Sequence, residues 1–253
     1  MKIAIITGAS SGIGREFVKQ IDCTEKLDEI WVIARRGERL EELKSIIKTR
    51  IRAISLDLTD EHSDEELSYL LSDTSPDVRV LVNAAGYGKF GEFENLSLPE
   101  QEGMVRLNIQ ALTKITYRVL PYMSNGARIY QVGSMSAFMP VPFISVYAAT
   151  KAYVVSFSRS LNRELRGRGI RVMAVCPGWV RTEIFDRAVV NDDVVVYYNK
   201  FYTPEQVVSL AIKDMKKGKQ VSVYGASVKL FVFLMKIMPH KFAMWVWCKQ
   251  QKK

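Results

Sequence analysis

The chain has 253 residues, of which 48% are hydrophobic, and this fits one α/β domain over residues 1–253 with ample length to bury a core. The formal net charge of +9 is spread along the chain without a recognition-helix or zinc-finger pattern, so we expect no nucleic-acid partner. Three cysteines lie far apart, which argues against a disulfide framework and indicates a reducing compartment, the cytoplasm. Two histidines lack carboxylate partners at ligand spacing, so we expect no metal site.

Short apolar runs alternate with helical patterns along the whole chain. The first run, "IAII", meets "TGAS" at once and is too short for a signal peptide. Near-continuous apolar strands that alternate with helices predict a doubly wound, seven-stranded parallel sheet of the Rossmann type, with helices on both faces. The predicted strands are Lys2–Thr7, Glu29–Ala34, Arg52–Asp57, Arg79–Asn83, Arg128–Ser134, Ile170–Cys176 and Gln220–Gly225.

Two helices can be placed between these strands from their local pattern. Residues 39–49 carry apolar side chains at three- and four-residue spacing, which predicts an amphipathic helix. A second helix is predicted to begin after Thr203, because Pro204 suits a first turn and Gln206 completes a capping box with Thr203. A sheet of this kind binds ligands beyond the carboxyl ends of its strands, where the strand order reverses.

The turn after the first strand, "TGASSGIG", holds Gly8, Gly12 and Gly14 directly before a predicted helix. Glycines at such a turn let the backbone approach a pyrophosphate, whose charge is met by the helix N-terminus. The spacing differs from the commoner G-x-G-x-x-G, and the alternative is an ordinary glycine-rich turn. Its position between strand and helix favours a dinucleotide site.

The end of the second strand indicates which dinucleotide would bind. An NAD-binding protein usually has an acidic residue there for the ribose 2′-hydroxyl, but this chain has Arg35 and Arg36. A guanidinium can pair with a 2′-phosphate, so we favour NADP(H) over NAD(H), with Ser10 as a further donor. The alternative is that both arginines point to solvent.

Tyr147 and Lys151 are four residues apart, which places them on one face of a helix. An ammonium about 4 Å from a phenol favours the phenolate by roughly 4 kcal/mol at an effective dielectric near 20. That would lower the pKa of Tyr147 by about three units before desolvation subtracts some, towards neutrality, where general acid–base catalysis works best. The alternative for Tyr147 and Lys151 is a solvated helix pair.

Several motifs in order resemble the short-chain dehydrogenase/reductase family, in its compact single-domain branch, over residues 1 to about 183. They are "TGASSGIG", "LDL", "NAAG", Asn108 in "VRLNIQA", Ser134 in "VGSMSA", "YAATK" and "PGWVRT". The resemblance implies that Tyr147 exchanges a proton with the substrate oxygen while hydride moves to or from the nicotinamide. It further implies that Ser134 hydrogen-bonds that oxygen, with Ser136 as a rival hydroxyl, and that Asn108 holds a water that passes protons to Lys151.

The resemblance also implies a dinucleotide site around these motifs. Asp57 and Leu58 would meet the adenine, Asn83 to Gly86 the adenosine ribose, Lys151 the nicotinamide ribose, and the segment from Pro177 the nicotinamide. The expected cofactor-binding residues are Gly8, Ser10, Ser11, Gly12, Ile13, Gly14, Arg35, Arg36, Asp57, Leu58, Asn83, Ala84, Ala85, Gly86, Tyr147, Lys151, Pro177, Gly178, Val180 and Thr182.

Residues 184–202 are predicted to cover the substrate as a lid. The segment is aromatic, which favours an apolar or ring-bearing substrate, although an aromatic loop packed on the core would read the same. Its aromatic residues are Phe185, Tyr197, Tyr198, Phe201 and Tyr202.

The tail, residues 226–253, is apolar almost throughout but is broken by lysines and a proline. It has no uncharged run near the roughly twenty residues that a membrane span requires. Three roles remain open: a subunit interface, a wall of an apolar substrate pocket, or a basic amphipathic contact with an anionic membrane.

These observations predict an NADP(H)-dependent oxidoreductase that interconverts a hydroxyl and a ketone on a hydrophobic substrate such as a steroid, an acyl chain or another lipid. We expect a homodimer or homotetramer in the cytoplasm, with possible peripheral membrane contact through the tail. The alternative is a catalytically silent protein that senses the dinucleotide; the set Asn108, Ser134, Tyr147 and Lys151 argues against it. A sugar-nucleotide epimerase or dehydratase fits poorly, because the chain lacks length for a separate sugar-nucleotide domain.

Overall fold

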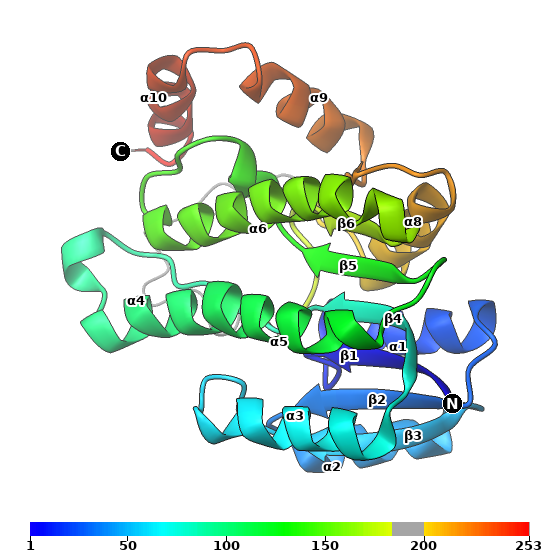
Figure 1. Cartoon of the computed structure of the whole chain (residues 1–253). Coiled ribbons are helices and arrows are strands. Elements are labelled where there is room, and N and C mark those ends of the chain that lie inside the picture. Colours follow the sequence, from blue (N-terminus) through cyan, green and yellow to red (C-terminus); the bar gives the residue numbers. More distant parts are fainter. Residues whose placement is uncertain (184–199, 253) are drawn as a thin grey trace.

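Seven parallel strands form one sheet in the order β3-β2-β1-β4-β5-β6-β7 (Figure 1). The computed structural model describes residues 1–183 and 200–252. The strands are β1 (Lys2–Thr7), β2 (Glu29–Ala34), β3 (Arg50–Ser55), β4 (Asp77–Asn83), β5 (Arg128–Val132), β6 (Arg171–Val175) and β7 (Val221–Ser222). The predicted fold, a doubly wound sheet in a single domain, is confirmed.

The apolar strands are buried on both faces, which is why they read as continuous apolar runs. In β1, Ile3 and Ile5 face one core cluster, while Ala4 and Ile6 face the other. All four side chains are fully buried. Each cluster lies between the sheet and a layer of helices, so the two faces of the sheet are covered independently.

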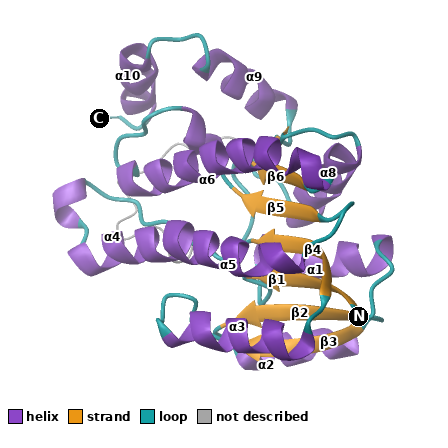
Figure 2. Ribbon diagram, in the orientation of Figure 1, coloured by secondary structure: helices purple, strands orange, loops and turns teal. Residues whose placement is uncertain are grey.

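Helices α1, α2 and α8 cover one face of the sheet, and α3, α5 and α6 cover the other (Figure 2). Further helices lie at the ends of the sheet. The helices are α1 (Gly12–Thr24), α2 (Gly37–Glu41), α3 (His62–Thr74), α4 (Leu98–Val105), α5 (Leu112–Val119), α6 (Ser145–Glu164), α8 (Pro204–Lys216), α9 (Ala226–Met235) and α10 (His240–Gln250).

The strand order reverses between β1 and β4, and this junction positions the site. Thr7, the last residue of β1, pairs with Ile33 on one side and with Asn83 on the other. Its hydroxyl oxygen accepts hydrogen bonds from the amides of Ala84 and Ala85, both at 3.1 Å. The carboxyl ends of the two central strands are therefore held together where a ligand is expected.

Of the two helices predicted from local pattern, one begins where expected and the other is shorter than expected. The capping box before α8 is confirmed: Thr203 Oγ1 accepts from the amide of Gln206, and Gln206 Oε1 accepts from the amide of Thr203. The helix predicted over residues 39–49 is wrong in extent, because α2 ends at Glu41 and a 3₁₀ turn follows to Ser45. The carboxylate of Asp22 accepts from the amides of residues 48 and 49, which draws the chain out of a helix and into β3.

The predicted lid lies mostly outside the described residues. Of its aromatic residues, only Phe201 and Tyr202 are described; Tyr202 is buried and its backbone bridges Val180. The predicted tail forms α9 and α10. No helix within residues 1–183 or 200–252 has the length and apolar character that crossing a bilayer would require.

Candidate active site

A cavity of about 950 Å³ opens at the carboxyl ends of the central strands. Every residue predicted to hold the dinucleotide borders it except Asn83, which is buried in β4 and donates to Thr116 Oγ1 at 3.0 Å. Of the four predicted catalytic residues, Ser134, Tyr147 and Lys151 border the cavity, and Asn108 lies behind its wall. Residues from seven different segments of the sequence thus meet in one place.

The glycine turn has the close approaches that a backbone cradle requires. Gly8 has φ +67°, and a Cβ there would lie 2.7 Å from the amide nitrogen of Ala85. A Cβ at Gly14 would overlap the carbonyl oxygen of Gly8. Side chains at these positions are therefore excluded, and the turn leaves backbone N–H groups and the N-terminus of α1 free to meet a phosphate.

Two arginines bind one carboxylate beside this turn, and one of them also contacts two serine hydroxyls. The guanidinium of Arg36 donates to Glu183 Oε2 at 2.7 Å and to the hydroxyls of Ser10 and Ser11, both at 3.1 Å. Arg39 donates to the other oxygen of the same carboxylate. Burial alone would raise the pKa of Glu183, but the two guanidinium groups lower it. The group as a whole is an anion site, and in this structure its anion is Glu183.

Sequence reasoning missed Arg39 and Glu183. Arg39 lies one helical turn beyond Arg36 and was read only as the start of a helix. Glu183 follows the last matching motif, "PGWVRT", and its meeting with Arg36 depends on the tertiary fold.

Arg35 makes longer and fewer contacts than Arg36. Its side chain is 63% exposed and lies 3.8 Å from Asp57 Oδ2. Asp57 Oδ1 accepts from both the amide and the hydroxyl of Thr59, at 2.9 and 2.7 Å. Burial raises the pKa of Asp57, but these hydrogen bonds and the charge of Arg35 lower it overall. Asp57 therefore borders the cavity as a carboxylate, with one oxygen already used by Thr59.

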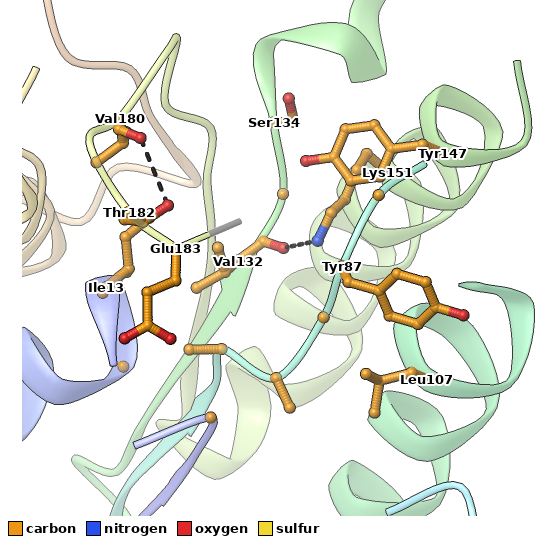
Figure 3. A pocket seen from close by; sticks show the side chains of 18 of the residues that line it. Ile13, Tyr87, Leu107, Val132, Ser134, Tyr147, Lys151, Val180, Thr182 and Glu183 are labelled. Carbon is orange, nitrogen blue, oxygen red and sulfur yellow. Dashed lines mark hydrogen bonds between the residues drawn. The ribbon is translucent and has the colours of Figure 1, made fainter. Parts of the chain in front are cut away.

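Tyr147 and Lys151 lie on the same face of α6 and point into the cavity, as the spacing predicts (Figure 3). The ammonium of Lys151 lies 5.7 Å from the ring centre of Tyr147. It donates to the backbone carbonyl of Val132, at the end of β5, at 2.8 Å. Lys151 is buried and fixed between α6 and the sheet, and Tyr147 is half-buried beside it, which rules out a solvated helix pair.

The expected direction of the tyrosine pKa is wrong in this structure. Burial raises the pKa of Tyr147 to about 12, although a hydrogen bond with Ser134 opposes the rise. Burial likewise lowers the pKa of Lys151 to about 8. Both shifts favour the neutral forms because each group is surrounded by protein, and the Lys151 ammonium is bound to Val132 rather than to the phenol.

Ser134 and Ser136 are hydrogen-bonded to each other. Ser134 ends the loop after β5, and its Oγ accepts hydrogen bonds from the amide and the hydroxyl of Ser136, at 3.2 and 3.0 Å. A hydroxyl that accepts two bonds still has its own proton to donate. Ser134 can donate this proton in a hydrogen bond to the Tyr147 oxygen or to a ligand oxygen in the cavity.

Asn108 lies in a π-helical segment, Arg106–Ala111, between α4 and α5. Such a widened turn is frequent at functional sites. Its side-chain amide donates to the carbonyl of Tyr87 at 2.9 Å and to Thr150 Oγ1 at 3.0 Å, and its oxygen accepts from the amide of Tyr87. A Cβ at Gly86 would stand 2.8 Å from that oxygen and 3.4 Å from the Lys151 ammonium. The missing side chain leaves a space between the two polar groups.

The other end of the cavity, beyond Tyr147, is apolar. Phe90 contacts both Tyr147 and Trp179 edge to face, with ring centres 6.3 Å apart in each case. The remaining wall comes from α9, α10 and the loop before α6. The apolar lining residues here are Phe90, Met139, Val141, Ile144, Trp179, Phe231 and Trp247.

Comparison with known proteins agrees with this arrangement. Residues 2–192 match the model of the short chain dehydrogenase family. The chain is 34% identical over 190 residues to sulfoacetaldehyde reductase 2 of Chromohalobacter salexigens, covering 72% of this chain and 73% of that protein. It is 31% identical over 193 residues to the very-long-chain 3-oxoacyl-CoA reductase of Macaca fascicularis, covering 72% and 60%.

Among solved structures, a short-chain dehydrogenase from Sphingobium yanoikuyae in complex with NADPH is similar over 94% of this chain and 97% of its own. The TM-score is 0.79 and the identity 26%. Sequence match, strand order and the placement of the motifs around one cavity all agree. The chain belongs to the short-chain dehydrogenase family.

Proposed function

We propose that the protein is an NADP(H)-dependent oxidoreductase that interconverts a hydroxyl and a ketone on an apolar substrate, with Tyr147 as the proton donor and acceptor. One observation carries the proposal. A turn suited to a phosphate, a half-buried tyrosine with a serine hydroxyl nearby, and an apolar end share one cavity of about 950 Å³.

The glycine turn and the donors beside it fit a dinucleotide. Gly8 and Gly14 let the turn pack tightly against neighbouring backbone, so that the N-terminus of α1 can face a pyrophosphate. Lys151 keeps two ammonium protons for a ligand after donating to Val132. When bound, a nicotinamide dinucleotide supplies or accepts the hydride. The protein's own residues would hold the dinucleotide, exclude water and transfer the proton.

The proton chemistry is suited to ketone reduction. With a pKa of about 12, Tyr147 carries its proton at neutral pH and can donate it to a carbonyl oxygen as that oxygen gains charge. Ser134 can donate a hydrogen bond to the same oxygen, because Ser136 occupies its acceptor positions. In the reverse direction Tyr147 would recover the proton from a hydroxyl.

A route for replacing the tyrosine proton passes behind the cavity wall. The space left by Gly86 lies between Asn108 Oδ1 and the Lys151 ammonium and suits a small polar group such as water. Lys151, with a pKa of about 8, can exchange protons near neutrality. Asn108 would fix the geometry of this space through its bonds to Tyr87 and Thr150.

The anion site supports NADP(H) over NAD(H). Arg36 and Arg39 both donate to the carboxylate of Glu183, and Arg36 also donates to the hydroxyls of Ser10 and Ser11. A 2′-phosphate would offer the two guanidinium groups more charge and one more oxygen. An acidic residue is absent from the end of β2, where a 2′-hydroxyl would use one.

The apolar chamber supports a hydrophobic substrate. The relatives act, by their names, on molecules as different as sulfoacetaldehyde and very-long-chain 3-oxoacyl-CoA, so family membership leaves the substrate open. The wall formed by Phe90, Trp179 and Trp247 offers area and few polar groups, which favours a steroid, acyl or other lipid-like ketone.

The test follows NADPH absorbance while panels of apolar and small polar ketones are added. Native protein should turn over apolar ketones, and Tyr147→Phe should lower the rate by about 10²- to 10⁴-fold while NADPH still binds. Tyr153→Phe is the matched control, because Tyr153 lies on the same helix and bonds to Thr113 away from the cavity. Tight NADPH binding without turnover by either protein would instead identify a dinucleotide sensor.

A further inference from the structure

Helices α9 and α10 carry large apolar side chains that stay exposed in the described part of the chain. They lie at one end of the molecule, outside the layers that cover the sheet (Figure 1). Their inner sides pack on the domain through buried residues such as Val232, Met235 and Ala243. Their outer side, which we call the tail surface, consists of Leu230, Phe233, Ile237, Phe242 and Trp245, each at least 50% exposed.

The tail surface is continuous along each helix. Leu230, Phe233 and Ile237 follow one another at spacings of three and four residues, so they form one stripe on α9 and the turn after it. Phe242 and Trp245 are one helical turn apart on α10, and their rings stack with centres 5.8 Å apart. Scattered exposed apolar residues need no explanation, but an ordered stripe of this size marks a binding surface.

All the formal side-chain charge of the tail itself is positive. After Asp214 the sequence has no acidic residue and nine lysines. Four of these, Lys229, Lys236, Lys241 and Lys249, are exposed on α9, α10 and the loop between them. None of the four forms an ion pair with any carboxylate in the described part of the chain. Lys249 instead lies 5.1 Å from the ring centre of Trp245.

We propose that the tail surface binds an anionic lipid bilayer, with α9 and α10 lying in the plane of its interface. Aliphatic and phenyl side chains would enter the acyl region, Trp245 would sit at the headgroup level, and the lysines would meet lipid phosphates. The helices have 10 and 11 residues, far short of the roughly twenty that a span requires, so an in-plane position is the one open to them.

The uniform positive charge of the tail favours an anionic bilayer over a second copy of the chain as the partner. Two copies joined through the tail surface would bring lysines against lysines, and the tail itself has no carboxylate to pair them. Like charges that face each other oppose association. A nucleic acid would meet the lysines but would leave Leu230 and Ile237 without an apolar partner. An anionic bilayer satisfies both the charge and the apolar area.

The bilayer would then lie beside the apolar end of the cavity. Phe231 on α9 and Trp247 on α10 border that cavity from the inner side of the same two helices. The indole of Trp247 donates to the carbonyl of Pro142 at 3.1 Å, which fixes α10 to the loop that lines the chamber. One helical pair thus presents one side to the chamber and the other to the proposed lipid surface.

The test is flotation of the full-length protein with vesicles of phosphatidylcholine alone and of phosphatidylcholine mixed with phosphatidylglycerol, at low and high salt. Native protein should float with the anionic vesicles, and salt should weaken this binding. Phe242→Ser and Trp245→Ser should each lower the partition coefficient by about tenfold, and Lys229→Gln and Lys236→Gln by about fivefold each.

Matched controls are Tyr117→Ser, an exposed aromatic on α5, and Lys26→Gln, an exposed lysine far from the tail; both should float like native protein. Thermal unfolding of every variant verifies the fold. Equal flotation of all variants, or no flotation, would overturn the proposal. So would a dimer in sedimentation velocity that Phe242→Ser dissociates, since it would assign the tail surface to a second copy.

Discussion

The guanidinium of Arg36 donates to the carboxylate of Glu183 at 2.7 Å, although 147 positions separate them in the sequence. The same guanidinium also contacts the two serines of the glycine turn (Figure 3 shows Glu183 directed towards this turn). An internal carboxylate thus occupies the donors that a 2′-phosphate would use. The proposed cofactor preference and the strength of cofactor binding both depend on this contact.

Glu183→Gln should strengthen NADPH binding about two- to fivefold, because the 2′-phosphate would no longer compete with a carboxylate for Arg36 and Arg39. The gain is small because the pair is partly exposed. Calorimetric titration with NADPH and NADH measures it. The affinity for NADH, which has no 2′-phosphate, should stay within twofold, and an equal gain for both dinucleotides would contradict the competition.

Arg36→Ala should weaken NADPH binding by about 10- to 100-fold, because a charge-assisted hydrogen bond to a phosphate contributes about 1.5–3 kcal/mol. Arg35→Ala is the matched control and should cost less, because Arg35 is largely exposed and makes one long contact with Asp57. Titration of both variants with NADPH and NADH distinguishes the roles. A larger loss for Arg35→Ala would assign the phosphate to that residue instead.

The stability of the protein should rise with pH between about 8 and 10.5 through Lys151. Its folded-state pKa is about 8 and its ordinary value 10.5, so in this window the unfolded chain binds more protons than the folded one. The gain from this group is at most about 3 kcal/mol. Below pH 8 the ammonium is charged in both states and no further change comes from it.

Thermal unfolding across this pH range, for native protein and Lys151→Met, isolates the effect. Exposed lysines contribute equally to both proteins, so the difference between the curves reports Lys151 alone. Lys151→Met should remove the rise. Parallel curves for the two proteins would show that Lys151 keeps its ordinary pKa in the fold.

Gly86→Ala should lower kcat, measured at saturating NADPH, by about tenfold or more. The new methyl group would stand between Asn108 Oδ1 and the Lys151 ammonium and would block the proposed proton route. Steady-state kinetics measure kcat, and NADPH titration verifies that the dinucleotide still binds. Unchanged kcat with intact dinucleotide binding would exclude a role for this space in proton transfer.

The sequence by itself determined the architecture and the order of the motifs. Strands β1 and β2 appear at the residues that their apolar runs predict, and the capping box of Thr203 and Gln206 begins α8. The four-residue spacing of Tyr147 and Lys151 placed both on one face of α6. Each of these features depends on bonds and periodicity within a short stretch of chain, which is why the sequence carries them.

The pKa shifts, the ion pair and the wall of the site depend on the tertiary structure. The distance from Arg36 to Glu183, the entry of Trp247 into the cavity wall and the premature end of α2 all depend on segments far apart in the sequence. The pKa of Tyr147 rises because protein surrounds the side chain. The spacing of residues along a helix does not show how much protein will surround one of them. Long-range packing sets desolvation and ion pairing, so these properties exist only once the chain has folded.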